Sequence, residues 1–256
     1  SGAVLALSDW NDEALRETAR MIGPARVLTK RVDVRSEDEV SSFAAEVKRE
    51  LGGAHVVVNN AGVSMSDMIG SMKRADFEWV MDIDFWGVVR GTEAFLPQLQ
   101  ARDDAHVVNI SSVFGLIAVP SQSAYNAAKF AVRGYTEALR HELHGSHVHV
   151  TCVHPGGVKT NIVRNGKNHH NTRGKATDTG AMSREFDLVA RTSPEEAARI
   201  IWRGVLRNDA RVLVGPDAHL IDAVQRLFPT GYQPIFRTLQ RAFDRLAPGR
   251  AAGARS

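Results

Sequence analysis

Short apolar runs alternate along this chain with longer runs of helical periodicity, and this alternation constrains the fold most strongly. The strand-like runs occupy residues 4–9, 26–34, 54–62, 106–112, 147–157 and 211–215. The helix-like runs occupy residues 11–22, 36–51, 77–96 and 123–143, and a further one begins at residue 193. Strands that alternate with helices form right-handed βαβ units, so we predict an α/β fold with a doubly wound parallel sheet of the Rossmann type. Ligands of such sheets bind at the carboxyl ends of the strands.

The size of the chain fits one large domain. Its 256 residues, 43% of them hydrophobic and 24% charged, have an ordinary globular composition. We predict a single domain over residues 1–228 and a basic amphipathic extension over residues 229–256. The apolar stripe of the extension consists of Ile235, Phe236, Leu239, Ala242, Phe243 and Leu246. Such a helix packs on a protein surface or lies on a membrane, and we expect packing, on its own domain or across an oligomer.

Composition and charge exclude several classes of protein. The single cysteine, Cys152, excludes an internal disulfide framework and fits a reducing compartment. The sequence has no run of about 18 apolar residues and no signal-peptide pattern, so we expect a cytoplasmic location. The net charge of +3 is mild and the arginines concentrate near the C-terminus, which argues against a nucleic-acid partner. The sequence shows no metal-ligand spacing, and we expect no metal.

Tyr125 and Lys129 lie four residues apart in a helix-like run, which places both side chains on one face. An ammonium beside a phenol favours the phenolate and lowers its pKa from about 10 toward the range of a general base. Ser111 and Ser112 end the preceding strand, where a hydroxyl is able to donate to a substrate oxygen. The alternatives are a solvated surface pair for Tyr125 and Lys129, and a simple strand-end turn for the serines.

Four motifs, in this order and spacing, resemble those of the short-chain dehydrogenase/reductase family. They are NNAG at 59–62, NISS at 109–112, YNAAK at 125–129 and HPGGVKT at 154–160, and the resemblance covers roughly residues 2–215. The resemblance implies a Rossmann-type sheet and a nicotinamide cofactor. It further implies that Tyr125 is the catalytic acid/base, that Lys129 lowers its pKa and binds the nicotinamide ribose, and that Ser112 positions the substrate oxygen.

The resemblance also implies which residues bind the cofactor. They are Asp9, Asp33, Val34, Asn60, Ala61, Gly62, Tyr125, Lys129, Pro155, Gly156, Val158 and Thr160. Asp9 ends the first strand-like run, where a carboxylate accepts hydrogen bonds from ribose hydroxyls and repels a 2′-phosphate. We therefore predict NAD in preference to NADP. The alternative for Asp9 is a helix cap, a role that Asn11 is also able to fill.

Asp84 departs from the family pattern, in which an asparagine at this position completes the catalytic tetrad and holds a water. The residue lies on or beside the apolar stripe of the run 77–96, where a carboxylate is unfavourable unless it is paired. We predict that Asp84 pairs with Lys129, belongs to the catalytic group and leaves activity intact. The alternative is that Asp84 faces solvent at the edge of the stripe.

Residues 161–190 are polar and aperiodic, and they follow the nicotinamide-side motif, so we predict a mobile substrate loop here. The adjacent His169 and His170 in this loop are expected to be solvated, and the alternative is that they act as ligands or acid/base groups. Apolar residues beside Ser112 favour a pocket for an apolar substrate, and they are Phe114, Leu116, Ile117 and Val119.

These residues together predict a homo-oligomeric enzyme, as is usual in the family. We expect it to transfer a hydride between NAD(H) and a largely apolar secondary alcohol or ketone. The alternative is a catalytically impaired family member that acts as a binding or interaction module.

The start of the chain also departs from the family. There, the strand that ends in the acid is the second, and a first strand, a Gly-rich turn and a helix precede it. No Gly-x-x-x-Gly-x-Gly precedes Asp9, so the usual N–H donors to the pyrophosphate are missing. The first strand normally lies between the run 4–9 and the run 54–62. We therefore expect an N-terminally truncated product with two unpaired strand edges, poor NAD binding and a tendency to aggregate.

Overall fold

The computed structural model describes residues 2–22, 27–171, 174–234 and 238. Its elements, in chain order, are β1 (Leu5–Asp9), α1 (Asp12–Ile22), β2 (Val27–Arg31), α2 (Glu37–Leu51), β3 (Val56–Asn59), β4 (Met65–Ser66), α3 (Arg74–Met81), η1 (Asp82–Trp86), α4 (Gly87–Gln100), β5 (Ala105–Ile110), η2 (Val113–Gly115), α5 (Ser123–Glu142), β6 (Val148–Pro155), β7 (Lys167–Asn168), α6 (Thr179–Val189), α7 (Pro194–Leu206), β8 (Arg211–Val214) and α8 (Pro216–Leu227). The pairs between these strands are parallel, which confirms the predicted α/β fold of the Rossmann type.

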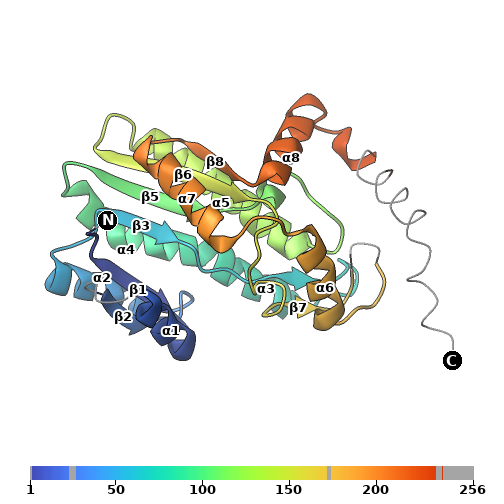
Figure 1. Ribbon diagram of the computed structural model, residues 1–256, viewed down its shortest axis with the longest axis horizontal. Helices are drawn as coiled ribbons and strands as arrows, with labels where there is room; N and C mark the ends of the chain where they lie inside the picture. The colour runs from blue at the N-terminus through green and yellow to red at the C-terminus, as the bar shows by residue number, and fades with distance from the viewer. Residues whose placement is uncertain (1, 23–26, 172–173, 235–237, 239–256) are drawn as a thin grey trace.

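The strands form two parallel sheets and one short ladder. β1 pairs with β2, and the larger sheet has the order β3-β5-β6-β8, so the carboxyl ends of its strands meet at one edge. β4 pairs with β7, which joins the segment after β3 to the loop after β6. Figure 1 shows the β1–β2 pair with α1 set apart from the four-stranded sheet, which has α4 and α5 on one face and α7 on the other.

One apolar cluster joins the two sheets. It includes Val32 after β2, Phe43 on α2, Val57 in β3, and Phe95 and Leu99 on α4, all of them buried. The rings of Phe43 and Phe95 meet edge to face, with their centroids 5.9 Å apart. Side-chain packing through α2 therefore holds the β1–β2 pair beside the four-stranded sheet.

The inner edges of β1 and β3 are open in the part of the chain that the structure describes. No described strand pairs with either edge. As a result, Val58 in β3 is 53% exposed, β1 is only partly buried, and Val4 before it is 51% exposed. The opening strand is therefore not fully buried, and the two unpaired edges agree with the expectation.

The helix-like run 77–96 consists of three consecutive segments. α3 leads into the π-helical segment η1, and α4 follows and ends at Gln100. The predicted run ends at residue 96, but α4 contains Pro97 and continues to Gln100, although a proline in a helix removes one backbone hydrogen bond. Gly87 begins α4 against the loop after β2, since a Cβ on Gly87 would lie 2.9 Å from Val34 Cγ2.

The first two helices begin with side-chain caps. Asn11 Oδ1 accepts a backbone N–H in the first turn of α1 at 3.1 Å. Ser36 Oγ accepts the N–H of Glu39 at 3.2 Å, as in a capping box. The Glu39 carboxylate, however, accepts the N–H of Asp33 at 2.9 Å. This contact fixes the turn that carries the predicted adenine-side residues.

The sequence pattern does not predict β4, β7, α6 or α8. The residues that form the apolar stripe of the predicted extension lie outside the described residues. Tyr232, which precedes that stripe, is buried, and its hydroxyl accepts the N–H of Ala118 at 3.1 Å. Among the helices that the structure describes, none combines the length and the hydropathy needed to cross a bilayer.

Candidate active site

A buried ion pair lies where β3 and β5 end beside the middle of α5. The ammonium of Lys129 is 3.2 Å from Asp84 Oδ2 and donates a hydrogen bond to the carbonyl of Ile110 at 3.1 Å. The other carboxylate oxygen of Asp84 accepts the N–H of Val63 at 2.8 Å. Lys129 is 3% exposed and Asp84 is fully buried, so the predicted pairing is confirmed and the solvent-facing alternative is wrong.

Asp84 reaches this position from the π-helical segment η1. A π-helical turn contains one residue more than an α-helical turn, and such segments occur frequently at functional sites. Gly62, the last residue of NNAG, covers the ion pair, because a Cβ there would lie 3.4 Å from both Asp84 Oδ2 and Lys129 Nζ. In the sequence, the buried position of Asp84 is indicated by one feature, which is a carboxylate on an apolar stripe.

Tyr125 lies one turn before Lys129, whose ammonium is 5.5 Å from the centroid of the Tyr125 ring. Burial raises the pKa of Tyr125 above its ordinary value. Lys129 and a hydrogen bond with Ser112 lower this pKa, whereas the Asp84 carboxylate raises it. The prediction that Lys129 brings the phenol below its ordinary pKa is therefore wrong for the net shift. Lys129 acts in the predicted direction, but burial and Asp84 outweigh it.

The ion pair keeps Lys129 charged. Burial disfavours the ammonium, but the charges of Asp84 and Tyr125 outweigh burial and raise the pKa of Lys129 above its ordinary value. Burial also raises the pKa of Asp84, although Lys129 and the N–H of Val63 oppose this shift. Lys129 is therefore an ammonium at neutral pH, and it interacts electrostatically with both Asp84 and Tyr125.

Ser112 follows β5 and caps the short helix η2. Its Oγ accepts the N–H of Phe114 at 3.1 Å, and its hydroxyl is hydrogen-bonded to Tyr125. Its carbonyl accepts a hydrogen bond from Nδ1 of His154 at 3.0 Å. Burial lowers the pKa of His154 to about 4, so a neutral imidazole on β6 holds the backbone of Ser112. The HPGGVKT motif contains His154 but does not predict this contact.

The end of β6 and the loop after it carry the predicted nicotinamide-side residues, which are Pro155, Gly156, Val158 and Thr160. Asp217 on α8 accepts the N–H of Gly157 at 2.6 Å. A Cβ on Gly156 would lie 2.1 Å from the same carboxylate, so this approach requires glycine. Asp217 lies outside every motif and on a helix that the sequence pattern does not predict, which explains why sequence reasoning does not find it.

The predicted adenosine-side residues come from both sheets. Those after β3, at positions 60–62, are exposed. Asp9 at the end of β1 is also exposed, and its carboxylate accepts the N–H of Asn11 at 2.8 Å, so Asn11 rather than Asp9 caps α1. The Asp33 carboxylate pairs with Arg35 at 2.6 Å, and this hydrogen bond holds the pKa of Asp33 below its ordinary range. Val34 packs against the start of α4.

The substrate loop, residues 161–190, contains more regular secondary structure than its sequence indicates. It contains β7 and α6, which the sequence pattern does not indicate, and its mobility and its contact with substrate stay predictions. His169 is exposed, as expected. His170 is only partly exposed, and its Nδ1 lies 2.7 Å from Asp67 Oδ1, so the expectation of a solvated His170 is wrong.

The apolar residues after Ser112 divide into two groups. Phe114 meets the Tyr125 ring edge to face, with the centroids 6.2 Å apart, and Val119 is partly exposed. Leu116 and Ile117 are each 2% exposed. We therefore retain Phe114 and Val119 as candidate pocket residues and assign Leu116 and Ile117 to the core.

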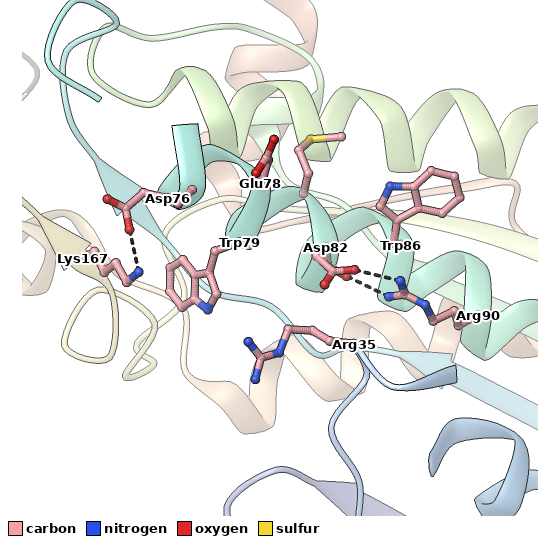
Figure 2. A pocket seen from close by; sticks show the side chains of 10 residues that line it. Arg35, Asp76, Glu78, Trp79, Asp82, Trp86, Arg90 and Lys167 are labelled. Carbon is pink, nitrogen blue, oxygen red and sulfur yellow. Dashed lines mark hydrogen bonds and ion pairs between the residues drawn. The ribbon is translucent and has the colours of Figure 1, made fainter. Parts of the chain in front are cut away.

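A cleft of about 620 Å³ lies elsewhere, against α3, η1 and the start of α4. Figure 2 shows Trp79 in this cleft beside Lys167, whose ammonium is 4.3 Å from the ring centroid. Its cations face acids, with Lys167 2.6 Å from Asp76 and Arg90 2.8 Å from Asp82. The cleft is lined by none of the predicted catalytic residues, so we place the candidate active site at the Tyr125 end of α5 instead.

A doubly wound parallel sheet with serine, tyrosine and lysine grouped at its strand ends defines an α/β oxidoreductase class. Residues 1–171 match the family model described as short chain dehydrogenase. A protein of Mycobacterium tuberculosis that carries the name oxidoreductase SadH is 47% identical over 238 residues, which cover 91% of this chain and 84% of that protein. Estradiol 17-beta-dehydrogenase 11 of Macaca fascicularis is 28% identical over 247 residues, which cover 94% and 76% of the two chains.

A solved structure has the same fold. A short-chain dehydrogenase/reductase from Burkholderia phymatum in complex with NAD superposes with a TM-score of 0.76 at 27% identity, and the match covers 88% of this chain and 84% of that one. This chain belongs to the short-chain dehydrogenase/reductase family of oxidoreductases.

Proposed function

We propose that this protein is an NAD-dependent dehydrogenase or reductase that interconverts a largely apolar secondary alcohol and its ketone. The observation that carries the proposal is the buried Lys129 ammonium, which faces the Tyr125 ring on one side and Asp84 on the other. The partly exposed Phe114 beside Tyr125 supports an apolar substrate. The name of one relative, estradiol 17-beta-dehydrogenase 11, supports an alcohol of the same character.

In this proposal Tyr125 carries the proton. During oxidation, the hydroxyl proton of the alcohol passes to the Tyr125 phenolate while the carbinol C–H bond breaks and its hydrogen leaves with the electron pair. The nicotinamide, when bound, supplies the acceptor for that hydride. Ser112 donates a hydrogen bond to the substrate oxygen, and the Lys129 ammonium stabilises the phenolate. Ketone reduction runs the same transfers in reverse.

The described residues fit a dinucleotide at its two ends. The exposed Asp9 carboxylate is suited to ribose hydroxyls, and the exposed backbone of residues 60–62 to the adenosine. Trp10, not an arginine, follows Asp9, so nothing at this position invites a 2′-phosphate. We therefore propose NAD in preference to NADP, with Lys129 and the loop 155–160 on the nicotinamide half. The Burkholderia phymatum neighbour in complex with NAD supports this choice.

The experiment that tests the function is Tyr125→Phe, assayed with a panel of secondary alcohols and ketones and both nicotinamide cofactors. We expect the substitution to abolish turnover and to leave NADH affinity nearly unchanged in a fluorescence titration, because it removes the proton carrier and little binding surface. The matched control is Tyr135→Phe on the same helix, whose ring packs on Phe85 with the centroids 6.3 Å apart and which should keep its turnover. Turnover of Tyr125→Phe within a few-fold of the parent would remove Tyr125 from the mechanism.

A second candidate function is a cofactor-binding module without catalysis. It is favoured by one observation, which is that burial and the Asp84 carboxylate together raise the pKa of Tyr125. NADH binding by the parent without turnover of any alcohol or ketone would identify this alternative.

We further propose a homo-oligomer in a reducing, cytoplasmic setting. Cys152 is buried, and burial raises its pKa to about 12, which makes it an unreactive thiol rather than a disulfide partner. Trp202 and Leu206 on α7 are 49% and 69% exposed, and an exposed apolar helix face of this kind suits a contact between copies of the chain.

A further inference from the structure

The substrate loop, residues 161–190, is joined to the rest of the protein by a very short ladder. β4 and β7 pair over two residues each, in the register Met65–Lys167 and Ser66–Asn168. Further backbone bonds extend the contact, including the N–H of His169 to the carbonyl of Ser66 at 2.7 Å. Two-stranded pairings are marginal by themselves, so side chains decide how firmly the loop is seated.

Asp67, directly after β4, supplies a buried acceptor to this loop. It is 5% exposed, and its Oδ1 accepts the hydroxyl of Ser71 at 2.6 Å and the N–H of Met68 at 2.8 Å. Nδ1 of His170, from the substrate loop, is 2.7 Å from the same oxygen. Burial acts to raise the pKa of Asp67, but the bonds from Ser71 and His170 outweigh it and the pKa is lowered. The group is therefore a carboxylate, and His170 donates to it.

The same short segment also contacts the start of the helix that carries Tyr125. The N–H of Asp67 donates to the carbonyl of Ser121 at 2.8 Å. Ser66 Oγ lies 3.0 Å from Ser121 Oγ and also donates to the carbonyl of His170. Ser121 has a φ of +62°, a left-handed conformation that a serine keeps only when its surroundings fix it. Residues 66 and 67 thus connect the substrate loop to the beginning of α5.

The other ion pairs of the loop are exposed. Lys167 pairs with Asp76 beside Trp79, as Figure 2 shows, but its side chain is 43% exposed. Arg164 pairs with Asp187 at 2.9 Å, and this contact lies within the loop itself. Exposed ion pairs contribute little in water. The contact between the partly buried His170 and the buried Asp67 is less exposed than these ion pairs, so we take it as a side-chain anchor of the loop.

We propose that Asp67 and His170 are positioning residues that seat the substrate loop over the Tyr125 end of α5, and thereby set the affinity for the alcohol or ketone. The proposal rests on the function proposed above. If the anchor is lost, only a fraction of the molecules has a seated loop, and the apparent substrate affinity falls by that fraction. Saturating substrate restores the seated state, so the maximal rate and the affinity for the cofactor stay unchanged.

The test compares His170→Leu, which removes the donor, with His170→Asn, whose Nδ2 takes the place of Nδ1 and still donates. We expect KM for the alcohol or ketone to rise about tenfold in His170→Leu, in line with the loss of a hydrogen bond to a charged group. We expect kcat and the NADH dissociation constant to stay within about twofold of the parent, because the substitution leaves Tyr125, Lys129 and the cofactor contacts in place. His170→Asn should recover most of the lost affinity. Arg164→Gln is the matched control, because it breaks an ion pair inside the same loop, and its KM should equal that of the parent.

Amide hydrogen exchange gives a readout that does not depend on turnover. Exchange in residues 161–171 and 174–190 should be about tenfold faster in His170→Leu than in the parent and in Arg164→Gln. Unchanged exchange in His170→Leu overturns the proposal, and so does a loss of kcat at constant KM. If the parent turns over no alcohol or ketone, the proposed function fails by itself, and the exchange experiment still decides whether His170 anchors the loop.

Discussion

Replacement of His154 by asparagine should remove a specific loss of stability at acid pH. His154 is fully buried on β6 and holds the carbonyl of Ser112 through Nδ1 at 3.0 Å. Burial lowers its pKa to about 4 from an ordinary value of 6.5. Between these two values the unfolded chain binds a proton that the folded protein does not. The depressed pKa of the folded state therefore contributes stability that is present at neutral pH and is lost as pH falls toward 4.

The size of this effect follows from the two pKa values of His154. At pH 4.5 a histidine in the unfolded chain is almost fully protonated, whereas His154 in the folded protein is about one quarter protonated. The difference corresponds to about 2.5 kcal/mol of unfolding free energy lost between pH 7.5 and pH 4.5. Other groups, such as the buried His106 with a pKa of about 4, add to the total loss of stability. The quantity to measure is therefore the difference in unfolding free energy between the parent and the variant at each pH.

The assay is urea unfolding followed by circular dichroism at pH 7.5, 6.5, 5.5 and 4.5. His154→Asn keeps a donor for the Ser112 carbonyl but leaves some space unfilled, so we expect it to be about 1–2 kcal/mol less stable at pH 7.5. Between pH 7.5 and pH 4.5 the unfolding free energy of the variant should rise by about 2.5 kcal/mol relative to that of the parent, because asparagine does not titrate. The deficit at pH 7.5 should therefore disappear or change sign at pH 4.5. His169→Asn, at an exposed position in the substrate loop, is the control and should track the parent. Parallel pH curves for the parent and His154→Asn would refute the reasoning.

Two further substitutions test the site and the fold. Asp84→Asn removes a charge that raises the pKa of Tyr125, so the rise of kcat/KM for alcohol oxidation should move to lower pH, and superimposable pH–rate profiles would show that Asp84 is not coupled to the reaction. Gly91→Ala should lower the unfolding free energy by about 1–3 kcal/mol in urea, because the new Cβ would lie 2.2 Å from Asn59 Oδ1. Gly134→Ala on α5 is its control, since a Cβ there meets no atom within 4 Å and should be neutral or stabilising, and equal effects of the two alanines would contradict this account.

The parts of the site that follow from local periodicity can be predicted from the sequence. A spacing of four residues on a helix is enough to place Tyr125 and Lys129 together, and the apolar stripe around Asp84 is enough to predict a buried partner for that carboxylate. The alternation of strands and helices likewise predicts the parallel sheet and the edge where these residues meet. Each of these predictions depends on residues close together in the chain or on a rule that holds for every doubly wound sheet.

The remaining contacts join segments that are far apart in the chain. Asp217 holds the loop after β6, and His170 bonds to Asp67, through pairs separated by 60 and 103 residues. No spacing rule links such residues, because their approach depends on how α8 and the substrate loop pack. The same limit explains the pKa of Tyr125. The sequence identifies the lysine that lowers it, but only the packed structure shows that burial opposes Lys129 more strongly.

The carboxylate of Asp84 balances the positive charge of Lys129 in the resting site. With Lys129 an ammonium, Asp84 a carboxylate and Tyr125 a neutral phenol, the three groups have no net charge. Loss of the Tyr125 proton then creates a net negative charge in a buried place, whereas an asparagine at position 84 would make the same step a neutralisation. The phenol is thus the favoured form at neutral pH, and the phenol is the form that gives its proton to a ketone. We therefore expect alcohol oxidation by this protein to require more alkaline conditions than oxidation by an Asp84→Asn variant, in line with the raised pKa of Tyr125.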